Sequence, residues 1–151
     1  MRLAVSIASC LAAVALAGCG GSDVEVDLVW AGPPEPGEAG GVSVNGFASF
    51  QGSVDEPWER SPAMAAGEFL RLDERTAART TIDARAETGE GTGPQTVVVT
   101  LEGLADDSVR AERWTLGFEP EDEVYVLTAA LREQRCHPGR GHDDFSAAPC
   151  V

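Results

Sequence analysis

Apolar and polar positions divide the chain into three zones, and each zone predicts a different structure. Residues 3–16 form an almost unbroken apolar run behind Arg2, which is the order of a secretory signal segment. The run is about 14 residues long, whereas a membrane-spanning helix needs roughly 20, so we expect no permanent spanning helix there. Residues 20–41 are rich in Gly, Pro and acids and predict a flexible tether, because such a composition buries little apolar surface. Residues 42–151 predict a single globular domain.

The domain begins with two predicted short helices. Apolar residues recur at helical spacing between Val42 and Asp55, namely Val44, Phe47, Ala48 and Phe50. Glu56-Pro57-Trp58 predicts a break, and Ser61-Pro62 predicts an N-cap followed by proline at the first helical position. We expect this second helix to continue to about Asp73, with an apolar face of Met64, Ala65, Phe69 and Leu72.

After Arg75 the apolar period changes to two, which predicts four strands. The first is expected to be half-buried through Thr80, Ile82, Ala84 and Ala86, and the second through Val97, Val99 and Leu101. The third runs from Ser108 to Phe118 and changes phase midway, so we predict a β-bulge near Glu112-Arg113. The fourth runs from Val124 to Arg135.

Two helices followed by a four-stranded antiparallel meander predict an α+β layer fold. This order of elements resembles cystatin-like and NTF2-like folds, in which a curved sheet wraps a helix. The resemblance concerns only the order of elements over residues 42–135. An all-β fold is the competing prediction.

The apolar leader ends in Leu16-Ala17-Gly18-Cys19, which resembles the lipobox of bacterial lipoproteins. Cleavage after Ala17 at an ordinary signal-peptidase site is the alternative. Cys10 leaves with residues 1–18, so the exported chain would hold Cys19, Cys136 and Cys150. If the last two pair, Cys19 is left over and lipidation gives it a role. We therefore expect a mature chain that starts at Cys19, held on a membrane by acyl chains outside the cytoplasm.

The charge balance of the chain limits the classes of partner that it can bind. The chain has no lysine, and export removes only Arg2, which leaves ten arginines against 25 carboxylates and a formal charge of −15. Such an excess of negative charge repels nucleic acids and anionic lipid headgroups, so we expect neither as a partner. Gly20 follows the lipobox cysteine where an inner-membrane lipoprotein would carry Asp. This favours the outer membrane if the host has one, and otherwise the outer face of the cell membrane.

The most distinctive segment is residues 135–150, which follow the pattern R-C-x-P-G-R-G-H-x-D-F-S-x-x-x-C. This segment, together with residues 106–110, resembles a family of uncharacterised bacterial exported proteins. The resemblance implies export and a shared fold, and no activity. From the residues themselves, a Cys136–Cys150 disulfide closing a 15-residue loop is the first prediction, worth about 3 kcal/mol.

Two other interpretations of the same segment stay open. A zinc site would use Cys136, His137, His142 and Cys150, although their spacing fits no zinc-finger pattern. A patch that recognises a small anion or a sugar would use Arg140, His142, Asp143 and Asp144. Tyr125 would belong to a different site, as the polar group of an aromatic ligand pocket. The simpler alternative is that Arg140 pairs with one of these aspartates and holds the loop together.

Elsewhere the simpler interpretations concern packing and turns. Asp106-Asp107-Ser108 suggests either a calcium- or magnesium-binding fragment or a turn that caps local N–H groups. The aromatic residues either line a ligand pocket or form the core, and they are Phe47, Phe50, Trp58, Phe69, Trp114 and Tyr125.

We predict no catalytic residue, no metal and no cofactor. The expected role is a non-enzymatic module of the cell envelope that binds a protein or a small ligand. One alternative is an NTF2-like enzyme with Asp83, His142 or Tyr125 acting inside the cup. The other is a structural protein of the envelope.

Overall fold

The computed structural model describes residues 29–88, 91 and 93–151; the signal segment, Cys19 and most of the predicted tether lie outside this range. Four antiparallel strands form one sheet in the order β1-β2-β3-β4. The strands are β1 (Ala77–Ala86), β2 (Gln95–Leu104), β3 (Val109–Glu121) and β4 (Val124–Cys136). They follow α1 (Asn45–Gln51), the 3₁₀ turn η1 (Pro57–Arg60) and α2 (Pro62–Leu70), so the predicted α+β meander is confirmed.

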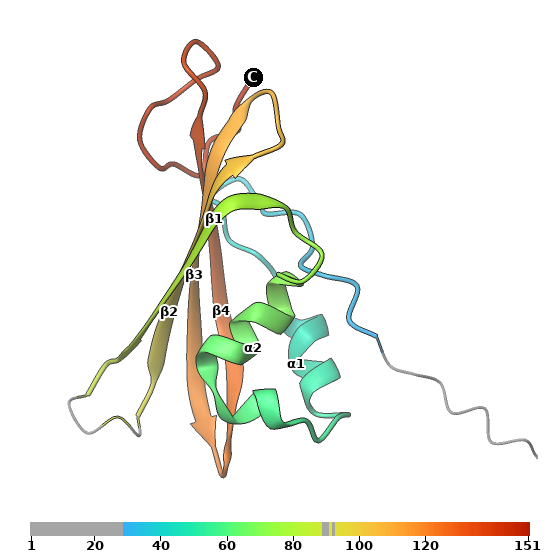
Figure 1. Cartoon of the computed structure of the whole chain (residues 1–151). Helices are drawn as coiled ribbons and strands as arrows, with labels where there is room; N and C mark the ends of the chain where they lie inside the picture. The colour runs from blue at the N-terminus through green and yellow to red at the C-terminus, as the bar shows by residue number, and fades with distance from the viewer. Residues whose placement is uncertain (1–28, 89–90, 92) are drawn as a thin grey trace, which may run out of the picture.

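The helices lie against one face of the sheet, beside the half that ends in the β3–β4 hairpin (Figure 1). The core forms between them and the alternate residues of β2, β3 and β4 that point toward the helices. Its largest buried side chains are Trp114, Phe47, Phe69, Phe118, Leu70, Leu101, Leu116 and Leu127. The aromatic residues therefore belong to the core or pack against it.

The N-terminal signals of α2 are confirmed, whereas both helices are shorter than predicted. The Ser61 hydroxyl accepts a hydrogen bond from the Met64 N–H at 3.4 Å, and Pro62 opens the helix. Arg71 adopts a left-handed conformation with φ of 50°, and its N–H bonds back to the carbonyl of Glu68. This turn ends α2 at Leu70 rather than near Asp73.

The prediction that β1 is half-buried is wrong. The strand exists, but its residues from Ala78 to Ala86 are exposed on both faces. Ile82 lies opposite the buried Val99, on the helix side of the sheet, yet it is 44% exposed. Alternation alone does not show whether a layer covers the strand, and here the helical layer packs mainly on β2 and β4.

The phase change in β3 also has a different cause from the predicted bulge. Glu112, Trp114, Leu116 and Phe118 all point toward the helices, while Ala111 lies on the opposite face and is also buried. The pairing of β3 with β4 is irregular at two places, between Val109 and Ala111 and between Gly117 and Phe118, and neither coincides with the predicted position at Glu112-Arg113.

The flexible tether does not extend to residue 41. Trp30 packs against the core, with ring centroids 5.2 Å from Phe47 and 5.9 Å from Phe69. Its indole N–H donates to the Phe69 carbonyl at 2.8 Å. Further along, Gly40 is buried and Gly41 forms a β-bridge with Leu131. A tryptophan and a close glycine contact thus fix this segment against the domain.

Candidate functional site

The C-terminal segment is held against the end of β4. A disulfide joins Cys136, the last residue of β4, to Cys150, with Cα atoms 5.5 Å apart, which confirms the predicted pair. Within the loop, Ser146 and Gln134 exchange two backbone hydrogen bonds of 2.8 and 2.9 Å. The chain therefore returns along the outer edge of β4 before it reaches the disulfide.

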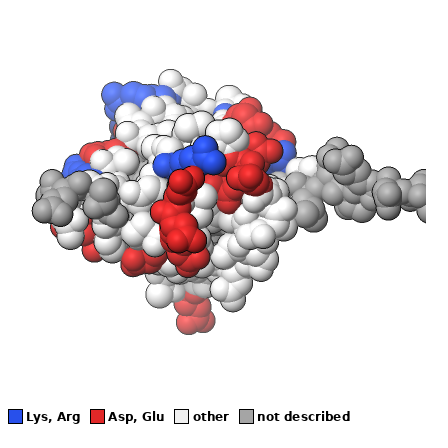
Figure 2. Space-filling model, turned by 90° about the horizontal axis from the view of Figure 1, so that it is seen from below, with Lys and Arg blue, Asp and Glu red and all other residues white. Residues whose placement is uncertain are grey.

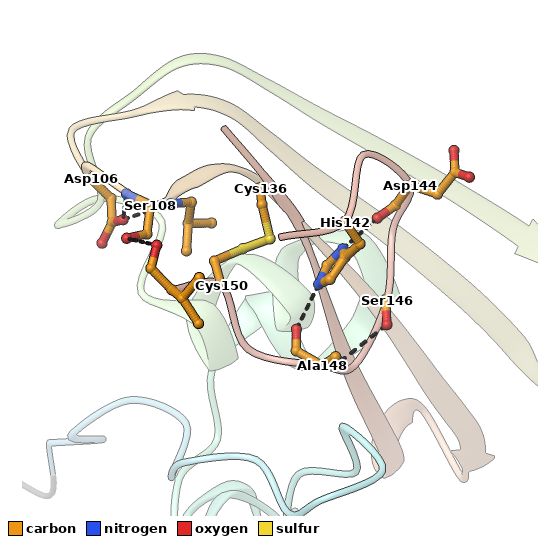
Figure 3. Close-up of a disulfide and its surroundings, with 10 residues drawn as sticks. Asp106, Ser108, Cys136, His142, Asp144, Ser146, Ala148 and Cys150 are labelled. Carbon is orange, nitrogen blue, oxygen red and sulfur yellow. Dashed lines mark hydrogen bonds between the residues drawn. A yellow bond between two sulfur atoms is a disulfide. The ribbon is translucent and has the colours of Figure 1, made fainter. Parts of the chain in front are cut away.

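The two sequence segments that carried the family resemblance lie side by side, as Figure 3 shows. The Ser108 hydroxyl donates to the carbonyl of Val151 at 3.0 Å, and the His137 N–H donates to the Ser108 carbonyl at 2.8 Å. Asp106 accepts the N–H groups of Ser108 and Val109, both at 2.7 Å. These hydrogen bonds, with that from Val109 first, lower the pKa of Asp106. Asp106 thus caps a turn, as the simpler interpretation predicted.

His142 forms a bridge across the C-terminal loop. Its Nδ1 lies 2.8 Å from the carbonyl oxygen of Asp144, and its Nε2 lies 2.8 Å from that of Ala148. A carbonyl oxygen only accepts, so both ring nitrogens must donate, and the geometry fits the charged imidazolium. The bonds to Ala148 and then Asp144 raise the pKa of His142. In this position His142 is a structural clamp, and neither nitrogen is free to take a proton from a substrate.

The potential metal ligands are only partly brought together. The ligand atoms of Cys136, His142 and Cys150 lie within 4.8 Å of one another, whereas His137 does not belong to the group. The disulfide joins both sulfurs, and a zinc ion would need two free thiolates. The group as it stands therefore acts as a covalent staple beside a histidine clamp.

The predicted ligand-binding residues lie at two separate places on the molecule. Arg140 and Asp143 are exposed on the C-terminal loop, beside the bridged His142. Among the described residues, no ion pair joins Arg140 to Asp143 or Asp144, so the predicted staple within the loop is not formed. Tyr125 lies at the opposite end of β4, roughly 35 Å away for the eleven-residue separation from Cys136, with its hydroxyl 3.5 Å from the Gln95 amide.

A buried ionic cluster around Glu112 was not predicted from the sequence. Glu112 is only 7% exposed, and its carboxylate accepts from Arg75 Nη1 at 2.7 Å, from Arg132 and from the Trp114 indole N–H at 3.1 Å. Burial raises the pKa of Glu112, but Arg132, Arg75 and Trp114 outweigh it and the net pKa is lowered. The guanidinium groups of both arginines also lie over the Trp114 ring, 5.6 and 5.8 Å from its centroid. The signal was present, because Glu112 is in phase with the core positions of β3.

A groove of about 530 Å³ lies beside this cluster. One wall is the segment 35–38, with Glu35 and Glu38, and the other is the C-terminal loop at Ala147 and Pro149. Arg132 and Gln134 of β4 contribute to its lining. Arg132, which pairs with Glu112 and lies 3.9 Å from the Glu35 carboxylate, thus forms part of the groove between acidic and apolar walls.

The enzyme hypothesis depended on a cavity inside the cup of the sheet. That space is filled by Phe69, Trp114, Leu116 and Leu127, each at most 1% exposed. Asp83 lies on an exposed strand and pairs with Arg85, rather than facing the interior. This pairing, with the Arg85 hydrogen bond first, lowers the pKa of Asp83, which is the opposite of what a general acid requires.

The charge pattern at the end of the molecule with the β3–β4 hairpin agrees with the overall acidity. Figure 2 shows acidic side chains spread over that end, with only scattered basic ones. Among the residues that the structure describes, no helix is both long enough and apolar enough to cross a bilayer.

Comparison with known proteins adds no family. No family model matches the chain, and no curated protein or solved structure is significantly similar to it. The resemblance of residues 106–110 and 135–150 to an uncharacterised exported family therefore stays a prediction, and the fold and the geometry of the C-terminal loop carry the functional argument.

Proposed function

We propose that this protein is a lipid-anchored module of the bacterial cell envelope that binds a partner or a small ligand and performs no catalysis. One observation carries the proposal: Cys136 and Cys150 pair with each other. Of the three cysteines beyond the apolar leader, this pairing accounts for two, and the third, Cys19, stands at the end of Leu16-Ala17-Gly18-Cys19. A disulfide also suits the oxidising space outside the cytoplasm.

The binding role rests on how the polar groups are used. His142 is bonded through both nitrogens, the C-terminal sulfurs are oxidised, and Glu112 is enclosed by cations. None of these groups is available as a nucleophile or a general base. The exposed part of the site is instead a groove whose walls are fixed by a disulfide and by backbone pairing, which suits recognition by a preformed surface.

The anchor is tested by Cys19→Ser, with Cys10→Ser as the matched control inside the leader. We expect the wild-type protein and the control to incorporate radiolabelled palmitate and to partition with detergent, whereas Cys19→Ser loses both properties. Palmitate incorporation by Cys19→Ser would overturn the proposed anchor.

The groove is tested by placing a photo-crosslinking amino acid at Ala147 in the lipidated chain, with Asp55 on the helical side as the control position. Recognition at the groove is supported if Ala147 gives a defined adduct that excess unlabelled wild-type protein abolishes by competition. Excess Arg132→Gln protein should leave the same adduct unchanged. Equal adducts from both positions would contradict it.

A further inference from the structure

The two edges of the sheet are covered very differently. The outer edge of β4 pairs with Gly41 and with Ser146 of the same chain. By contrast, no described residue pairs with the outer edge of β1, and from Ala78 onward the strand is exposed on both faces. Figure 1 shows the far end of β1, together with the start of β2, extending away from the helices.

An open strand edge is a template for pairing with another strand, and natural proteins usually obstruct it. Proline, lysine and β-bulges are frequent obstructions, and β1 contains none of them; it carries Arg79, Asp83 and Arg85. Its sequence is instead rich in strand-forming residues at its centre, Thr80-Thr81-Ile82. The charges then decide which partner strand fits.

We propose that β1 is a dimerisation edge, at which it pairs antiparallel with β1 of a second copy around a two-fold axis at Thr81. Side-chain alternation restricts such self-pairing, because paired residues must lie on the same face of the joined sheet. The axis must therefore pass through a residue and not between two residues, which leaves only a few registers.

The axis at Thr81 is the best of these registers. It pairs residues 77–85 of both copies and places Arg79 of each copy opposite Asp83 of the other, which creates two opposite-charge pairs. An axis at Ile82 would oppose Arg79 to Arg85 twice, and an axis at Asp83 would oppose two Asp83 carboxylates. An axis at Thr80 overlaps fewer residues and pairs no opposite charges.

The existing contacts of these side chains do not prevent the pairing. Arg79 forms an ion pair with Glu102, and Asp83 forms one with Arg85. Because the side chains of Arg79, Asp83 and Arg85 are largely exposed, these ion pairs contribute little to stability and exchange readily. On the helix side, the same register places the exposed Ile82 opposite Thr80 of the partner and covers part of its apolar surface. Two copies thus form one continuous eight-stranded sheet.

The register makes a sharp prediction for cysteine crosslinking in the native membrane. Residues at the axis have Cα atoms about 4.5–5.5 Å apart, within the range of a disulfide. Thr81→Cys should therefore give a disulfide-linked dimer on a non-reducing gel. Ala84→Cys is the matched control on the same exposed strand, because in this register its two copies lie about 20 Å apart.

A charge exchange tests the ion pairs in the Thr81→Cys background. Asp83→Arg turns two opposite-charge pairs into two like-charge pairs and should lower the crosslinked fraction about tenfold. Adding Arg79→Asp should restore it, while Asp55→Arg, with the same change of net charge outside the strands, should have no effect. Circular dichroism verifies that each variant is folded.

Equal crosslinking of Thr81→Cys and Ala84→Cys would overturn the proposal, as would crosslinking that survives Asp83→Arg. Adducts of Thr81→Cys with a different protein, or with the protein's own N-terminal segment, would also overturn it. The result is independent of the lipid anchor, because the same variants can be compared in the Cys19→Ser chain.

Discussion

The two edges of the sheet, β1 and β4, are built from strands of similar length and the same backbone, yet the chain treats them in opposite ways. β4 receives backbone hydrogen bonds from residues 40–42 on one half and from Ser146 on the other, and a disulfide fixes the second half. β1 receives none from the described residues outside the sheet. The comparison teaches that stability is concentrated along β4, whereas β1 remains available for contacts with other molecules.

The largest effect should follow from removing the staple of the β4 edge. Replacing Cys136 and Cys150 together with serine releases a loop of 15 residues and should lower the free energy of unfolding by about 3 kcal/mol. Chemical denaturation of the variant, compared with wild type under oxidising and reducing conditions, measures the loss. Reduced wild type should match the variant, and an unchanged midpoint in both would contradict a stabilising role for the loop.

The next effect concerns the glycine that lets residues 40–42 approach β4. Gly40 has φ of +78°, and a Cβ there would lie 2.5 Å from the Arg132 carbonyl oxygen and 2.8 Å from the Ala147 Cβ. Gly40→Ala should cost about 2–3 kcal/mol from backbone strain and overpacking together.

Gly139→Ala is the matched control, because Gly139 has φ of +79° with nothing within 4 Å of its Cβ position. It should show the strain alone, about 1–2 kcal/mol. Equal losses in the two alanine variants, measured by thermal and chemical unfolding, would mean that residues 40–42 are free to move away from β4.

The contrast between the edges also marks how far the sequence could predict the structure. The sequence predicts the order of elements, the buried positions of β2 and the Cys136–Cys150 pair. Period-two alternation and the number of cysteines suffice for this, because they depend on local or covalent constraints. The sequence does not predict the exposure of Ile82, because this exposure depends on where α2 packs. Trp30 in a Gly/Pro-rich segment indicates a contact with the domain, since a large aromatic residue seldom stays in solvent, but the sequence does not show which residues it packs against.

The candidate site divides in the same way. The C-terminal loop could be predicted from its cysteines and glycines, and its contact with Ser108 could not, because 43 residues separate Ser108 from Val151. The cluster around Glu112 was not predicted, because a charged residue at a core position of β3 was taken to indicate a β-bulge. Its partners Arg75 and Arg132 come from different elements, and only the folded chain places them together.

A smaller, pH-dependent effect should come from the clamp in the C-terminal loop. The pKa of His142 is raised in the folded chain, first by its bond to Ala148 and then by that to Asp144, and the charges of Asp143 and Asp144 add to this. The group is protonated in both folded and unfolded chains below its ordinary pKa of about 6.5, so its contribution is fully present there. It is lost as the pH rises through the raised folded-state value.

We therefore expect the stability difference between wild type and His142→Gln to be largest below pH 6.5 and to decrease at higher pH. Unfolding midpoints across that range measure it, with His137→Gln as the control at the other loop histidine. A difference that grows with pH would show that His142 is neutral in the loop.

The smallest effect on the free energy of unfolding should be found on the open edge itself. There, an exposed residue of β1 lies opposite a buried residue of β2. Ile82 and Val99 lie opposite each other in β1 and β2, with 44% and 0% of their surfaces exposed. Ile82→Thr should change the free energy of unfolding by less than about 0.5 kcal/mol, because an exposed edge position loses little packing. Val99→Thr should cost about 1–3 kcal/mol, since it buries a hydroxyl in the apolar core. Chemical denaturation at low protein concentration gives both values for the monomer. If Ile82→Thr proved as costly as Val99→Thr under those conditions, β1 would have to be covered within a single chain, and the difference between the two edges would disappear.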